Sequence, residues 1–321
     1  MTSLLEIREY IKNFYMKYEL YITYAWKFLL SFIALVMIGN KIGYQAGLTR
    51  LPIMLMVALL CAIMPANFMV FVSAGFILVH LYKLSLQCAV VALIVFLLMF
   101  LLYFRFSPKD TLAVMLTPMA FSIGIPYVMP VALGLLGTPA SIVSMSCGII
   151  VSFMVSYISS NATALTASDI EETANQFQTI ISELMGNKQM WMYVVCFMIT
   201  LVVVYVIRRM AVDHSWTIAI IAGALTDVIC LLVGDLVYST QLSFLGVFFQ
   251  TVISVGILFV IKFFAFNLDY TRIEKVQFED DEYYYYVKAV PKVSVNTPAP
   301  KVKKINQSSV NRDYRGRDRG E

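Results

Sequence analysis

Asp227 is the residue in this sequence best placed to do chemistry inside a membrane. It lies in the middle of the apolar run IAIIAGALTDVICLLVG. A carboxylate at membrane depth costs several kcal/mol unless it is paired, hydrated or protonated, and such residues commonly mark ion or substrate paths. We expect Asp227 to bind a cation or to carry a proton. The alternative is a structural carboxyl group that is hydrogen-bonded to a neighbouring helix.

Residues 117–148 form the second candidate site, because prolines and glycines interrupt an otherwise apolar stretch. The freed backbone groups are tolerated at membrane depth only when they are buried in protein or face a water-filled cavity. Interrupted apolar segments point to substrate sites in transporters. We therefore expect a substrate or ion path to involve Pro126, Pro130, Thr138 and Pro139.

The motif GTPAS, which contains Thr138 and Pro139, has the pattern of a helix start. A half-helix that begins there could face an anion with its free N–H groups. The alternative is an ordinary tight turn between two spans. The neighbouring stretch GLLGTPAS lacks the lysine and the spacing of a phosphate-binding loop, so it does not predict nucleotide binding.

The third candidate site is the aromatic run FEDDEYYYYVKAVPK at residues 278–292. Its strand-forming residues predict a β-hairpin over 272–290, with EDDE as the turn. A lone hairpin is only marginally stable in water. It needs a surface, which could be the bundle itself, a second copy, or a cytosolic protein that adds a strand. The candidate docking residues are Tyr283, Tyr284, Tyr285 and Tyr286.

No nucleophile–base set and no metal-binding cluster is evident in the sequence, so we expect neither an enzyme nor a cofactor. All five cysteines lie in apolar runs without a CxxC pair, and small packing residues are the natural interpretation: Cys61, Cys88, Cys147, Cys196 and Cys230.

The elements that position these candidates are membrane helices. Of the 321 residues, 60% are hydrophobic and 14% charged, whereas soluble domains are about 45–50% apolar and about 25% charged. Spans of about 20 apolar residues cross a bilayer, and the sequence predicts them at 26–43, 66–84, 86–104, 111–133, 138–158, 191–208, 215–234 and 242–266. The predicted fold is an all-α polytopic bundle with eight spans, or nine if the short run 51–64 also crosses.

Four regions are predicted along the chain. Residues 1–24 carry an amphipathic helix, which lies either at the membrane interface or as a cap on the bundle. Residues 25–267 form the bundle and include an extracytoplasmic loop, 159–190, with a second amphipathic helix. Ser168 and Glu171 resemble a capping box for that helix, and Gly186 is its stop. Residues 268–292 hold the hairpin, and 293–321 form a disordered basic tail.

Basic residues favour the cytoplasmic side of a membrane. The chain after residue 267 is rich in lysine and arginine, so we expect it to lie in the cytoplasm of a plasma-membrane protein. Eight spans then place the N-terminus inside as well. This count leaves four basic residues on the outer side: Lys41, Arg50, Arg105 and Lys109.

These features favour a transporter or the permease-like component of a transport complex. Residues 28–65 and 197–235 share a hydropathy pattern, as a duplicated transporter unit would. The energy would come from an ion gradient or from a separate ATPase subunit at the C-terminal tail. The alternative is a membrane scaffold that recruits a cytosolic protein through residues 268–321 without transport. We expect the lipid bilayer as a partner and no nucleic acid.

Overall fold

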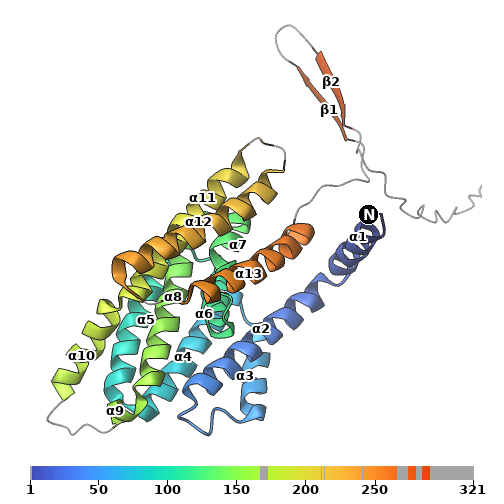
Figure 1. Cartoon of the computed structure of the whole chain (residues 1–321). Coiled ribbons are helices and arrows are strands. Elements are labelled where there is room, and N and C mark those ends of the chain that lie inside the picture. Colours follow the sequence, from blue (N-terminus) through green and yellow to red (C-terminus); the bar gives the residue numbers. More distant parts are fainter. Residues whose placement is uncertain are drawn as a thin grey trace, which may run out of the picture. The chain divides into compact units, whose positions relative to one another are not determined.

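The computed structural model describes residues 2–166, 173–210, 212, 214–240, 242–265, 274–279 and 284–289. The chain divides into two units, Lys12–Phe266 and Met1–Ile11 with Asn267–Glu321. In the described residues the larger unit is helical (Figure 1). The capping box at Ser168 and Glu171 and the tail 293–321 lie outside the described residues.

The helices follow one another in this order: α1 Thr2–Lys17, α2 Glu19–Ile42, α3 Leu51–Ile63, α4 Ala66–Leu84, α5 Leu86–Phe106, α6 Thr111–Ile123, α7 Val128–Leu136, α8 Ser141–Ser160, α9 Ala162–Thr166, α10 Thr173–Gly186, α11 Lys188–Arg209, α12 Ser215–Tyr238 and α13 Phe244–Ala265. Seven of the described helices are long and apolar enough to cross a membrane: α2, α4, α5, α8, α11, α12 and α13. The chain is therefore a multi-pass helical membrane protein.

The predicted single span at 111–133 is wrong, because two short helices, α6 and α7, occupy this stretch. Gly124 ends α6 in the left-handed conformation, with φ 83°. The Ile125 N–H donates to the Ala120 carbonyl at 2.9 Å, which closes the turn at the helix end. Pro126 follows and disfavours a helical conformation at Ile125, so the helix cannot continue.

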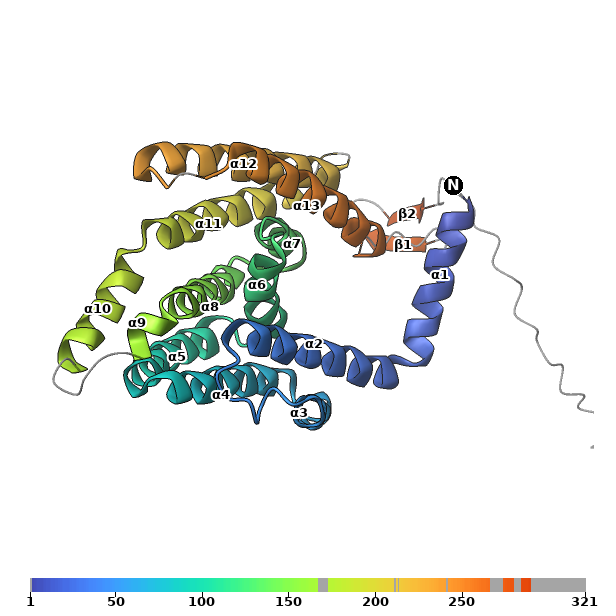
Figure 2. The same ribbon diagram turned by 60° about the horizontal axis from the view of Figure 1, so that its bottom comes forward.

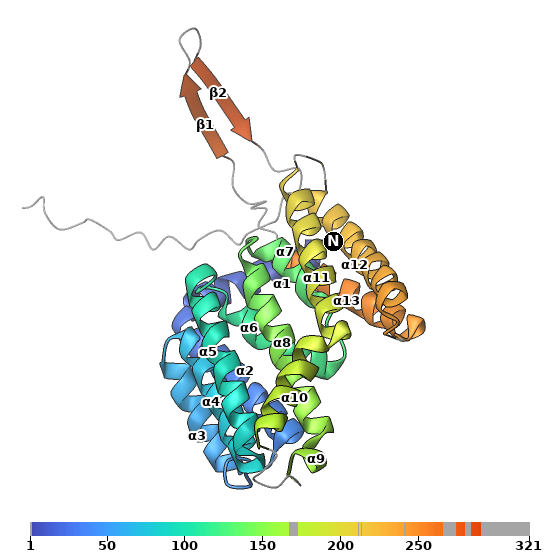
Figure 3. The same ribbon diagram turned by 90° about the vertical axis from the view of Figure 1, so that its left-hand side faces the viewer.

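The two short helices belong to different groups of neighbours. α6 packs against α8, α4 and α2, whereas α7 packs against α11, α13 and α12. Figure 2 and Figure 3 show α6 and α7 between the helices α2–α5 and the helices α11–α13. The largest buried cluster joins α4, α5, α8 and α11 through residues such as Leu81, Phe96, Met154 and Phe197. The interruption after Gly124 therefore lies between two helix groups of the bundle.

The smaller unit contains two paired strands, β1 Glu274–Glu279 and β2 Tyr284–Ala289. They are antiparallel, and Glu279 pairs with Tyr284. The strands fall within the range 272–290 that the sequence assigns to a hairpin. The residues between them, 280–283, lie outside the described residues, and Tyr283 is one of these.

Candidate functional site

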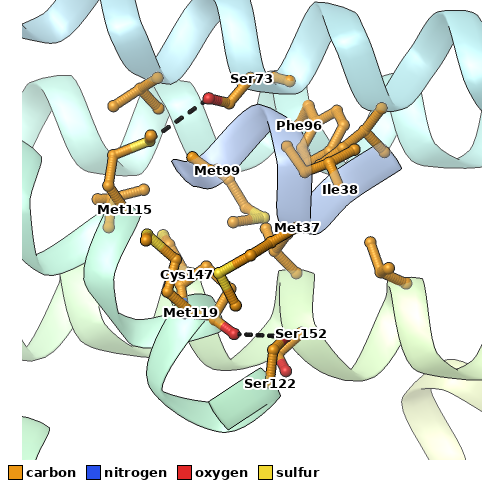
Figure 4. A pocket seen from close by; sticks show the side chains of 18 of the residues that line it. Met37, Ile38, Ser73, Phe96, Met99, Met115, Met119, Ser122, Cys147 and Ser152 are labelled. Carbon is orange, nitrogen blue, oxygen red and sulfur yellow. Dashed lines mark hydrogen bonds between the residues drawn. The ribbon is translucent and has the colours of Figure 1, made fainter. Parts of the chain in front are cut away.

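A cavity of about 100 Å³ lies among α2, α4, α5, α6 and α8. Its walls are mainly apolar and rich in sulfur-bearing side chains: Met37, Met99, Met115, Met119 and Cys147 (Figure 4). The polar side chains on the walls are few and comprise Lys41, Ser73, Tyr103, Ser122 and Ser152. No carboxylate is among the described residues that line the cavity.

Asp227 lies on α12 with only 1% of its surface exposed. The Thr200 hydroxyl, from α11, donates to Asp227 Oδ1 at 3.2 Å. The second carboxylate oxygen, Oδ2, is buried and has no hydrogen-bond partner among the residues described. An unpaired charge is strongly disfavoured in an apolar interior, so a carboxylate with one unpartnered oxygen favours binding a proton or a cation there.

Tyr127 connects the α6–α7 interruption to the surroundings of Asp227. Its side chain is 3% exposed, and its ring meets Phe197 edge-on at 6.1 Å between ring centroids. The phenol groups of Tyr127 and Tyr193 are close enough to interact electrostatically. Both tyrosines are close enough to Asp227 for its charge to act on their hydroxyl groups. A change in charge at Asp227 would therefore act on the first residues after the interruption.

The far end of α7 is held by a cation. The Arg208 guanidinium, from α11, donates to the carbonyl oxygens of Leu135 and Gly137 at the end of α7. Carbonyl groups at a helix C-terminus lack partners within the helix, and a positive charge there is favourable. Both ends of α7 are thus tied to α11, through Tyr127 at the start and Arg208 at the end.

The structure separates the residues that the sequence grouped together. Pro126 and Pro130 are buried at the start of α7. Thr138 and Pro139 are exposed beyond its other end, about 13 Å away by the rise of a helix of this length. The Thr138 N–H donates to Ser141 Oγ at 3.2 Å. Only Pro126 and Pro130 therefore share the neighbourhood of Tyr127.

Sequence reasoning did not single out Thr200, which bonds to Asp227, or Tyr127 and Tyr193, which lie within range of its charge. The available signal was a polar group within apolar runs, since such groups commonly hydrogen-bond between helices. Asn67 makes such bonds, since its Oδ1 accepts from Tyr103 at 2.9 Å and from Thr111 at 2.5 Å. Thr251 does not, because its hydroxyl donates to the Val247 carbonyl of its own helix at 2.8 Å.

Comparisons of the chain with known protein families, with curated proteins and with solved structures give no match.

Proposed function

We propose that the protein is a membrane transporter or the permease-like membrane component of a transport complex. One observation carries this proposal: the interrupted α6–α7 segment lines the cavity through α6 and adjoins Asp227 through Tyr127. A transporter needs a substrate-binding site and a group whose protonation or cation binding is coupled to that site. The interrupted segment links the cavity, as the candidate binding site, to Asp227, as the candidate coupling group.

The coupling follows from the cost of a buried charge. When Asp227 gains or loses a proton or a cation, its bond to Thr200 and its field on Tyr127 and Tyr193 change together. The turn at residues 124–127 separates α6 from α7, so the two helices can move as separate pieces, as in other interrupted membrane helices. Movement of α6 would reshape the cavity wall formed by Met115, Met119 and Ser122.

The remaining parts of the proposal concern location and energy. The basic chain after residue 267 favours a plasma-membrane protein with a cytoplasmic C-terminus. An ion gradient acting on Asp227 would supply the energy. An ATPase subunit bound at the tail is the other source.

A scaffold role is the second candidate, and the pairing of β1 with β2 favours it. A strand pair can receive a further strand from a partner protein at a free edge. Deleting residues 268–321 distinguishes the two roles when transport by the truncated protein is measured in liposomes. If the truncated protein still transports, the tail is assigned to recruitment. If neither the full-length nor the truncated protein transports, only the scaffold role remains.

Replacing Tyr127 by Phe tests the link between the interruption and Asp227. The variant keeps the ring against Phe197 but loses the hydroxyl that interacts with Tyr193. We expect thermal stability to change by no more than about 1 kcal/mol, which is typical of one hydrogen bond, whereas transport falls severalfold. Unchanged transport by Tyr127→Phe would remove the hydroxyl from the coupling path.

The proposal itself is tested by electrical recording from liposomes that contain the purified full-length chain, adsorbed on a solid support. Amino acids, sugars, nucleosides and alkyl carboxylates are applied in turn, with and without an imposed pH gradient. We expect one class to produce a transient current that protein-free liposomes lack. No current and no tracer uptake with any class, with or without the gradient, would contradict autonomous transport.

A further inference from the structure

The cavity also indicates what kind of molecule is transported, and this inference rests on the proposed function. We infer that the cavity among α2, α4, α5, α6 and α8 binds the alkyl chain of a single-chain amphiphile, and that Lys41 binds its anionic headgroup.

The walls of the cavity suit an alkyl chain better than a hydrated solute. Two of its three serine hydroxyls already have partners: Ser73 bonds to Met115 Sδ at 3.6 Å and Ser122 to the Pro118 carbonyl at 3.0 Å. A polar solute or a cluster of waters needs several such groups, because buried water makes two to four hydrogen bonds. The flexible thioethers of methionine adapt instead to apolar shapes that vary.

The cavity is elongated along α2. Ala34 and Lys41 both line it, and two turns of helix separate them by about 10 Å. Along α8, Lys41 Nζ donates to Ser156 Oγ at 2.8 Å, whereas Tyr103 is near Cys147, which lies about 13 Å further along that helix. Lys41 and Tyr103 therefore lie at opposite ends of the cavity.

The two ends differ in charge. At one end the Tyr103 hydroxyl lies 2.9 Å from Asn67 Oδ1 and 3.2 Å from Thr111 Oγ1, and these three groups satisfy one another. At the other end is the Lys41 ammonium, which has three donors and bonds to Ser156. No carboxylate among the described residues forms an ion pair with Lys41.

A cation at the end of an apolar slot is complementary to an amphiphile with a negative headgroup. The Lys41 side chain leaves α2 within its last turn, where a headgroup can remain near water while its chain enters the apolar part. Carboxylate, sulfate and phosphate headgroups share this chemistry, and the experiment below separates carboxylate from phosphate.

Binding is measured with radiolabelled probes on the purified full-length chain in lipid nanodiscs. The probes have six-carbon chains, in keeping with the size of the cavity, and are hexanoate, hexyl phosphate, uncharged hexanol and hexyltrimethylammonium. We expect saturable binding of at least one anionic probe with one site per chain, and much weaker binding of the cationic probe. The stronger anionic probe identifies the headgroup.

Two pairs of variants locate the site. We expect Lys41→Gln to weaken binding of the anionic probe by about tenfold or more, because a charge-assisted hydrogen bond is lost, and to leave hexanol binding unchanged. Lys83→Gln, which removes an exposed lysine from the last turn of α4, is the matched control. Met119→Trp fills the cavity and should abolish binding of both probes, while Leu97→Trp at an exposed position should not.

The possible results separate the ligand inference from the proposed transport function. Absence of saturable binding, equal binding of the cationic probe, or binding that Lys41→Gln and Met119→Trp leave intact in folded protein would overturn the inference. Currents from another substrate class without amphiphile binding would reject this ligand and retain the transporter. Amphiphile binding with no current from any class would retain the ligand site and count against transport.

Discussion

Replacing Asp227 by Asn is expected to reduce transport to the level of protein-free liposomes while the protein remains folded. The amide has nearly the shape of the carboxyl group but can neither ionise nor bind a proton. Thr200 can still donate to the amide oxygen, as it does to Asp227 Oδ1 at 3.2 Å. The variant therefore removes the charge and keeps the packing between α11 and α12.

Replacing Asp227 by Leu should have the same effect on transport and should raise the melting temperature. The carboxyl group is buried, and within the described residues Oδ2 has no hydrogen-bond partner. An apolar side chain with the same number of heavy atoms removes the cost of burying that polar group. A group kept for function commonly lowers stability, because function and stability make different demands on a buried site. Opposite changes in activity and stability would thus mark Asp227 as functional.

Both variants are compared in the same liposome recordings and by thermal unfolding in detergent. Asp110→Asn serves as the control, because Asp110 is a half-buried carboxylate at the start of α6 and away from the α11–α12 interface. Full transport by Asp227→Asn would dismiss the functional role. A fall in the melting temperature of both variants, with transport lost in proportion to unfolded protein, would identify Asp227 as a structural residue.

Replacing Gly223 by Ala is expected to destabilise the bundle by about 1–3 kcal/mol, the range for overpacked cores. A methyl group at Gly223 of α12 would lie 2.3 Å from Val204 Cγ2 and 3.2 Å from Val131 Cγ2. Val204 has little room to move, because Gly134 of α7 is also close to it: a methyl group at Gly134 would lie 2.7 Å from Val204 Cβ and Cγ1. Val204 is fully buried between the two glycines and is stiff about its first side-chain torsion.

Thermal unfolding in detergent checks this prediction, and the control is Gly256→Ala on α13. A methyl group at Gly256 would meet nothing within 4 Å, so this change should be neutral or stabilising by up to ~1 kcal/mol through helix propensity. Adding Val204→Ala to Gly223→Ala should make the loss smaller than the sum of the two single changes, because the clash disappears. Strict additivity, or equal effects of the two glycine variants, would contradict the close contact of α7, α11 and α12.

Much of the bundle could be predicted because membrane spans are local in sequence. A helix in lipid must satisfy its own backbone groups and present apolar side chains along its length, so α4, α5 and α12 lie close to the predicted spans. The boundaries were less accurate for α2, which begins at Glu19 rather than at residue 26. Polar and aromatic residues at the membrane–water interface continue a helix beyond its apolar part, and hydropathy does not register them.

Composition and hydropathy are enough to predict a multi-pass helical membrane protein, an interruption near Pro126 and a position for Asp227 within an apolar span. Which groups come together depends on the packing of the helices. Thr200 bonds to Asp227 from α11, Tyr127 and Tyr193 lie within range of its charge, and five helices contribute to the cavity beside Lys41. Hydropathy reports how each segment partitions between water and lipid, whereas these contacts depend on how rigid helices pack against one another, which is set by shape at residues such as Gly223 and Val204.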